Sequence, residues 1–148
     1  GSEMCIRDRC YAHATGVIMQ RIYKSFERQT MMKTLGASIT KVKKGLVEIA
    51  APILESSKQQ HGFSHAGMIF SIGDSAAGYA ALSVMENDFE VLTVEMKINL
   101  LAPGRHGPLR AIGTVEKSGR RLVIVRADVF DGETKVALMQ GTMIPVKI

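Results

Sequence analysis

The chain has 148 residues, of which 46% are apolar, 5% are aromatic and none is Trp. This length fits one domain with a full hydrophobic core and is too short for two independent ones. The formal net charge is +5, but Lys and Arg occur singly or in pairs. With so few aromatic residues, this composition argues against nucleic acid as a partner.

Residues 1–9 show no periodicity and begin with the Gly-Ser that tag removal often leaves. We therefore expect residues 1–9 to be tag-derived or disordered, and residues 10–148 to form the single domain. Cys5 and Cys10 are too close in sequence to staple a fold, and a reducing cytoplasm is the simplest setting for them. No apolar signal peptide is visible.

The first predicted element is an amphipathic N-terminal helix. Ile18, Ile22 and Phe26 recur at helical spacing, with basic residues on the other side, and Gly36 stands where a C-terminal cap belongs. The β-rich stretch 37–54 then predicts one strand or a bent pair.

Residues 66–85 form an apolar segment of about the length that crosses a bilayer. Asp74 lies in its middle, where insertion of a carboxylate costs roughly 2.5 to 3.5 kcal/mol, and Gly and Ser are frequent. We interpret the segment as a buried helix and expect no membrane span.

Residues 91–101 form the clearest strand, because Leu92, Val94, Met96, Ile98 and Leu100 alternate with polar residues. Strict alternation places those five in the core and Thr93 on the polar face. Further strands are predicted over 109–117, 121–131 and 134–146. One long apolar helix followed by antiparallel strands predicts an α+β fold, with the sheet wrapped around the helix.

Asp74 is the only charged residue of the predicted central helix. A buried carboxylate without partners is costly, so it is paired, protonated or placed at a cavity where a reaction uses it. The helix start offers free N–H groups, on Ala66 or Gly67, that suit an oxyanion. The alternative is a simple N-cap made by Ser64 or His65.

Ala66 and Asp74 are eight residues apart, or about 12 Å along a helix axis. One chain cannot easily bring both to one carbonyl. If two such helices lie antiparallel across a two-fold axis, Asp74 of one chain faces the helix start of the other, so the chemistry predicts a homodimer.

Gln59, Gly62, His65-Ala66-Gly67 and Asp74 follow one another at spacings that resemble the PaaI-type hotdog thioesterases. That family has a polar amide residue, Gly, His-Gly-Gly and an acidic residue at these positions. The stretch 92–104 is similar to the family's second strand and its exit, so the resemblance covers residues 38–148. It implies a hotdog fold and hydrolysis of acyl-CoA to free acid and CoA, with no cofactor or metal.

The resemblance also implies roles for single residues. Asp74 would be the general base for water, or the nucleophile that forms an anhydride. The N–H of Ala66, next to Gly67, would polarise the thioester carbonyl, although Ala66 stands where Gly is usual. Gln59 would orient the carbonyl or the water, although many relatives have Asn there.

Thr93 aligns with a hydroxyl position that holds the water in some members of the family. His65 would mainly shape the loop, with acid–base catalysis as the less favoured alternative. The histidines of the chain lack the companion ligands of a zinc site.

For the substrate, the resemblance implies two contact regions. The first is the loop before the central helix, formed by His61, Gly62 and Phe63. The second is a basic hairpin near CoA, formed by Lys117, Gly119, Arg120 and Arg121, for which a solvated surface turn is the alternative.

Three points stay open at this stage. The dimers can pair into tetramers, and the acyl group can be medium-chain, long-chain or aryl. The alternative functions on the same fold are a noncatalytic acyl-CoA sensor or carrier and a dehydratase, although Asp74 without a paired His does not suit the latter.

Overall fold

The computed structural model describes the backbone of residues 2–148 and the side chains of residues 15–148. The helices are α1 (Ser2–Glu27), α2 (Thr30–Thr34), the short 3-10 helix η1 (Glu55–Ser57) and α3 (Ala66–Leu82). The strands are β1 (Ser38–Lys43), β2 (Leu46–Ala51), β3 (Glu90–Leu100), β4 (Leu109–Ser118), β5 (Val123–Asp131) and β6 (Thr134–Val146).

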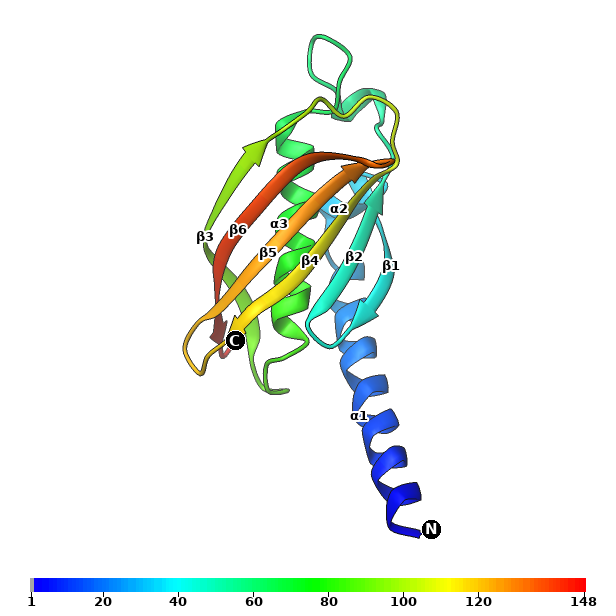
Figure 1. Ribbon diagram of the computed structural model, residues 1–148, viewed down its shortest axis with the longest axis vertical. Helices are drawn as coiled ribbons and strands as arrows, with labels where there is room; N and C mark the ends of the chain where they lie inside the picture. Colours follow the sequence, from blue (N-terminus) through cyan, green and yellow to red (C-terminus); the bar gives the residue numbers. More distant parts are fainter. Residues whose placement is uncertain (1) are drawn as a thin grey trace.

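The six strands form one antiparallel sheet in the order β1-β2-β4-β5-β6-β3. The sheet curves around α3, which crosses its inner face (Figure 1). This is the hotdog architecture, so the predicted α+β fold is confirmed. Because β3 pairs with β6 alone, it forms one edge of the sheet.

Small residues let the sheet approach α3 closely. Ala76 and Ala77 are fully buried in the helix, and Gly113 of β4 lies directly against them. A Cβ at Gly113 would overlap the backbone of both alanines. Glycine is therefore required at this position.

The N-terminal region differs from the single helix predicted up to Gly36. α1 ends at Glu27, and the short α2 follows with Gln29 as its N-cap. Gly36 does end this region, with a φ of 66° that favours glycine. The break was not predicted because residues 27–35 contain no Gly or Pro that would end a helix.

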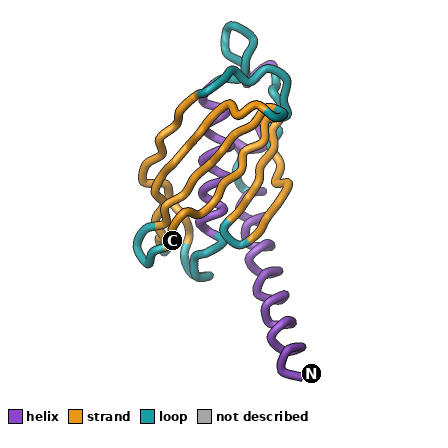
Figure 2. The backbone as a smooth tube through the Cα atoms, viewed as in Figure 1, coloured by secondary structure: helices purple, strands orange, loops and turns teal. Residues whose placement is uncertain are grey.

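The C-terminal half of α1 packs against α3, with Ile22 buried and the rings of Phe26 and Tyr79 in edge contact. The other half of α1 extends past the sheet (Figure 2). We predicted that residues 1–9 are tag-derived or disordered. Their side chains lie outside the described part of the structure, so this stays a prediction.

Several element bounds refine the predictions. The stretch 37–54 is the bent pair β1 and β2. The central helix ends at Leu82, before the predicted Met85, and β5 begins at Val123, which leaves Arg121 in the turn. None of the helices within the described residues combines the length and apolar character that crossing a membrane requires.

Candidate active site

Asp74 lies midway along α3, half-buried, and pairs with a residue of the edge strand. The Thr93 hydroxyl donates to Asp74 Oδ1 over 2.8 Å. Burial raises the pKa of the Asp74 carboxyl above its ordinary value, and the hydrogen bond from Thr93 partly offsets the rise. The structure therefore brings together two of the predicted site residues.

Thr93 reaches Asp74 because of a β-bulge. The pairing of β3 with β6 shifts register between Thr93 and Glu95, and one extra residue turns every following side chain to the other face. Leu92 and Val94 are consequently 51% and 55% exposed. The alternation that placed Leu92 and Val94 in the core and Thr93 on the polar face was therefore wrong. It was also wrong for Leu100 at the far end of β3, whose side chain is 53% exposed.

A hollow of about 190 Å³ opens beside Asp74. Besides Asp74 and Thr93, polar side chains from the N-terminal helices and from α3 line it: Ser25, Gln29, Ser75 and Tyr79. The sequence did not indicate Ser25, Gln29 or Ser75. Ser25 and Gln29 lie beside the unpredicted break between α1 and α2, and Ser75 lies on α3.

The start of α3 has one capped and one free amide. His65 is the N-cap, and its Nδ1 accepts a hydrogen bond from Gly67 N–H over 2.8 Å. His65 also donates its own N–H to Ser57 O over 2.9 Å. The Ala66 N–H has no hydrogen-bond partner among the described residues. Of the two amides considered, that of Ala66 is therefore available to a ligand.

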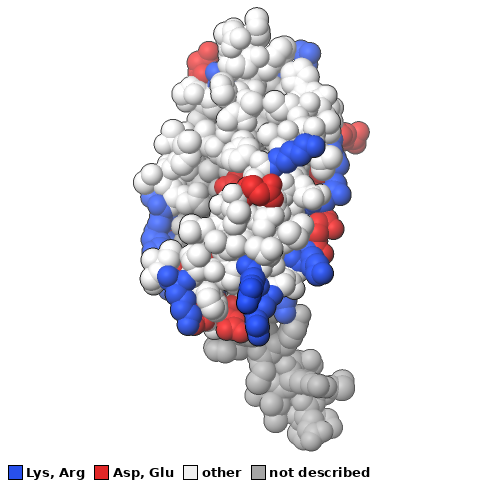
Figure 3. All heavy atoms as spheres, turned by 90° about the vertical axis from the view of Figure 1, so that its left-hand side faces the viewer, with Lys and Arg blue, Asp and Glu red and all other residues white. Residues whose placement is uncertain are grey.

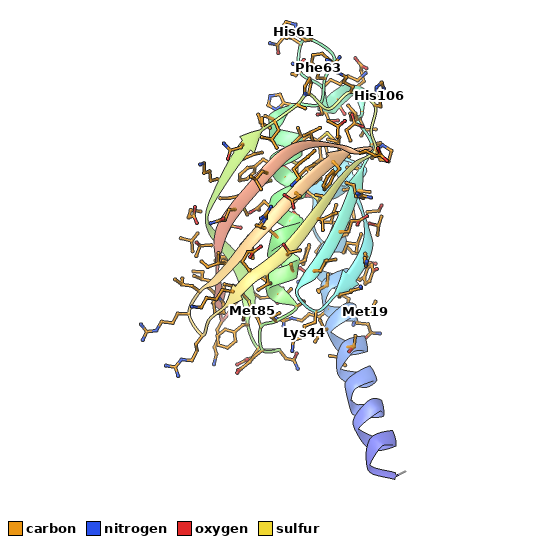
Figure 4. The ribbon with its side chains drawn as sticks, viewed as in Figure 1. Met19, Lys44, His61, Phe63, Met85 and His106 are labelled. Atoms are coloured by element: carbon orange, nitrogen blue, oxygen red, sulfur yellow. The ribbon has the colours of Figure 1, made fainter. Side chains whose placement is uncertain are left out.

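The loop before α3 is held by its own Gln59. The Oε1 of Gln59 accepts from the N–H groups of His61 and Phe63, and its backbone N–H donates to Phe63 O. Gly62 has a φ of 85°, which closes the turn. His61 lies exposed at the tip of the loop (Figure 4).

A second hollow, of about 390 Å³, includes Gln59, Phe63 and Ala66 among its lining residues. Asp74 does not line it, and Ala66 does not line the hollow beside Asp74. Within one chain the carboxylate and the free amide therefore face different hollows, as their separation along the helix predicted.

The basic hairpin between β4 and β5 lies at the opposite end of the molecule from the Gln59 loop (Figure 1). Lys117, Gly119, Arg120 and Arg121 are all exposed there. Gly119 and Arg120 border a hollow of about 290 Å³ whose other lining residues include Met85 and Phe89. Figure 3 shows Lys and Arg side chains toward this end, below a largely uncharged surface.

Comparison with known proteins places these features in a family. The family model described as the thioesterase superfamily matches residues 61–138. A putative esterase from Deinococcus radiodurans is 31% identical over 120 residues, which cover 79% of this chain and 80% of the relative. The acyl-coenzyme A thioesterase PaaI of Escherichia coli is 25% identical over 124 residues, which cover 82% and 86%.

Solved structures of thioesterases have the same fold as this chain. A thioesterase family protein from Silicibacter pomeroyi is 40% identical, with a TM-score of 0.85, and the match covers 88% of this chain and 99% of that protein. The Escherichia coli PaaI structure, 22% identical and matched over 89% and 95%, has the same fold with a TM-score of 0.82.

Proposed function

Because the chain belongs to the thioesterase superfamily and is a thioester hydrolase of the PaaI-type hotdog group, we propose that it hydrolyses acyl-CoA with Asp74 as its catalytic carboxylate. The observation that carries this proposal is the half-buried Asp74, held by Thr93 at a polar hollow. We further propose a cytoplasmic location, as expected from Cys5 and Cys10.

In the proposed reaction, Asp74 accepts a proton from a water molecule while the water oxygen bonds to the thioester carbonyl carbon. The C–S bond then breaks, and the CoA thiolate takes up a proton. A carboxylate with a raised pKa is a better proton acceptor than an ordinary one, which favours the general-base role. The alternative role for Asp74 is direct attack on the carbonyl to form an anhydride.

The free Ala66 N–H is the proposed oxyanion donor. It lies at the N-terminus of a 17-residue helix, where the helix dipole favours negative charge. The Gly67 amide is already bound by His65, so it supports the site by fixing the helix start. Gln59 lines the same hollow as Ala66, where its side chain would orient the carbonyl or the water.

A homodimer would complete the site. Since Asp74 and Ala66 face different hollows within one chain, a two-fold axis that sets two α3 helices antiparallel would join Asp74 of one chain to Ala66 of the other. The unpaired edge of β3 suits this contact, because it exposes apolar side chains at Leu92, Val94 and Leu100. Pairing of two dimers into a tetramer is an extension of the same proposal.

CoA would contact two surfaces that bear the predicted substrate residues. The exposed Lys117, Arg120 and Arg121 of the hairpin provide positive charge for its phosphates, beside Gly119. The loop of His61, Gly62 and Phe63 would border the entrance near Ala66. The guanidinium of Arg105 lies 4.6 Å from the centre of the Phe63 ring, which steadies this loop.

The test is thiol release from a panel of acyl-CoA thioesters by the wild type, Asp74→Asn and Ala66→Pro. Proline suits position 66 because it is the first residue of a helix and His65 has an extended backbone, with φ of −66° and ψ of 142°. The change thus removes the N–H and keeps the fold. We expect each variant to lose at least about 100-fold in kcat.

Mixing the two inactive variants tests the shared site. After subunit exchange, a heterodimer pairs the intact Asp74 of one chain with the intact Ala66 of the other, so about a quarter of the sites should recover. No recovery despite proven exchange would place both groups in one chain. Tight binding of acyl-CoA without turnover by the wild type would instead indicate a sensor or carrier.

A further inference from the structure

The hydroxyl of Thr93 lies between two acceptors. Its Oγ1 is 2.8 Å from Oδ1 of Asp74 on α3 and 3.2 Å from Sδ of Met143 on β6. A hydroxyl carries one proton, so it donates to one of these atoms at a time, while its lone pairs remain free to accept. Thr93 therefore has two settings, with its proton directed either to the carboxyl group or to the thioether.

Met143 is held in this place by the sheet and by α3. It is the cross-strand partner of Thr93 in the pairing of β3 with β6, directly before the bulge of β3. Its side chain is fully buried. Its methyl group lies at van der Waals distance from the place that a Cβ of Gly78 would occupy. The sulfur atom thus stays beside the Thr93 hydroxyl, out of reach of solvent.

The first setting belongs to the ionised Asp74. A hydrogen bond to a carboxylate is roughly twice as strong as one between neutral groups, and a thioether is a weak acceptor. The Thr93 proton therefore points to Asp74 Oδ1 as long as the carboxyl group is charged. In this setting Met143 contributes packing alone.

The second setting belongs to the protonated Asp74. A protonated carboxyl is itself a donor. When its proton is on Oδ1, it points at the Thr93 oxygen 2.8 Å away, and the Thr93 proton has to turn aside. Among the described residues, Met143 Sδ is the other acceptor that Thr93 reaches. When the proton is on Oδ2, Thr93 keeps its bond to Oδ1. The thioether therefore adds an arrangement in which both polar hydrogens have an acceptor.

The charges around Asp74 do not depend on Met143. Glu90 of β3 and Tyr79 of α3 are the other titratable residues that line the hollow, and no cation lines it. The remaining elements packed around Asp74 bring neutral side chains there, which are Ser25, Gln29 and Met143. Exchange of the thioether for a hydrocarbon leaves all of these charges in place, so it isolates the contact with Thr93.

We propose that Met143 is a positioning residue of the active site, whose thioether accepts the Thr93 hydroxyl proton when Asp74 becomes protonated. The inference rests on the proposed hydrolysis and goes beyond it. In that reaction one proton of water moves to Asp74 while the water oxygen bonds to the carbonyl carbon. The O–H bond of Thr93 rotates and does not break, so sulfur gains no proton. Thr93 turns back when Asp74 gives its proton to the CoA thiolate.

Met143→Leu removes the sulfur and keeps the volume, an exchange that cores tolerate well. Protonated Asp74 loses one of its arrangements, so its pKa should fall and the acidic limb of kcat/KM against pH should move to lower pH. The direction is opposite to that expected of Thr93→Val. Below the limb, kcat/KM relative to its own plateau should be about two- to fivefold higher than in the wild type, the effect of one weak hydrogen bond.

Two controls make this result specific. Met139→Leu is the matched variant, because Met139 is fully buried on the same strand, packs against Gly73 and pairs with Ile98. Its limb should coincide with that of the wild type. In a Thr93→Val background, Met143→Leu should leave the limb where Thr93→Val has put it. An unmoved limb in Met143→Leu, or an equal shift with and without the Thr93 hydroxyl, would overturn the inference.

A titration without turnover separates this inference from the proposed function. Carbon-13 NMR follows the Asp74 carboxyl signal, which its loss in Asp74→Asn assigns. If no thioester is hydrolysed, the proposed function fails. A lower pKa of Asp74 in Met143→Leu that requires the Thr93 hydroxyl would still support the inference, and an unchanged pKa would refute it. If Met143→Leu does not fold, replacement of methionine by norleucine exchanges sulfur for CH₂, and the same comparison with and without Thr93→Val decides.

Discussion

The hydroxyl of Thr93 donates a 2.8 Å hydrogen bond to Oδ1 of Asp74. This bond favours the ionised carboxylate, whereas burial favours the protonated acid. In the proposed reaction, the balance between these two effects sets the pH at which Asp74 acts as a base, and Thr93 is the partner that mutation can remove.

Thr93→Val should move the acidic limb of the rate profile. Without the hydroxyl, the pKa of Asp74 rises further, so a higher pH is needed to ionise it. We expect the acidic limb of kcat/KM against pH to shift upward, while Thr93→Ser leaves it in place. A limb that stays unchanged in Thr93→Val would assign the titration to another group.

Asp74→Asn should stabilise the fold at neutral pH. Because the folded pKa of Asp74 is raised, the ionised group is less favourable in the folded chain than in the unfolded one. This penalty is absent below the ordinary pKa and grows as pH rises through the folded pKa. Thermal unfolding followed by circular dichroism should give a higher Tm for the variant at about pH 7, and a smaller difference at about pH 4. The same difference at both pH values would contradict the burial effect.

His65 should prove to be a structural cap. His65→Asn keeps a side chain that can accept from the helix N–H groups, so we expect stability and kcat close to those of the wild type. His65→Ala loses the cap on Gly67 and should lower the free energy of unfolding by about 1 kcal/mol. Denaturant unfolding and turnover measure both effects, and an inactive but stable His65→Asn would point to acid–base catalysis.

Asp131 should stabilise the fold at neutral pH and lose this effect in acid. Burial alone would raise its pKa, but hydrogen bonds from the backbone N–H groups of His106, Arg105 and Gly107 outweigh that and hold the pKa below its ordinary value. The stabilisation is present above the ordinary pKa and disappears as pH falls through the folded pKa.

Asp131→Ala removes the acceptor of these bonds. At neutral pH it should lower the free energy of unfolding by about 1 to 3 kcal/mol, measured with denaturant. The deficit should shrink as the pH falls toward and below the folded pKa. A variant equally destabilised at all pH values would assign the effect to packing.

Val94→Lys tests the edge of β3 as the dimer contact. Two-fold pairing would bring the new charges of both chains together on an edge that now exposes an apolar side chain. We expect a monomer in sedimentation and a large loss of turnover. Met31→Lys, on the equally exposed side chain of α2, is the matched control and should leave the assembly intact.

Local patterns predicted most of the fold. The antiparallel strands are joined by short turns, and the apolar stretch 66–82 has one charge, so periodicity and turn residues sufficed to place them. Asp74 was likewise identified as a candidate site residue, because a lone carboxylate in an apolar helix is unusual. The resemblance to the PaaI-type hotdog thioesterases indicated the other candidate residues of the site.

The remaining features depend on contacts distant in sequence. Leucine, valine and methionine continue to alternate across the bulge of β3, so nothing local shows that Thr93 turns inward. The end of α1 at Glu27 likewise has no local signal, because no Gly or Pro lies near it. Nothing in the local sequence therefore indicated Gln29 as a site residue, although the structure places it at the hollow beside Asp74.

The break between α1 and α2 has an evolutionary consequence. The amide of Gln29 comes from the N-terminal helices, whereas Asp74 and Thr93 come from α3 and β3. Changes in the length or sequence of the link between the two helices would therefore alter one wall of the hollow while Asp74 and Thr93 keep their place.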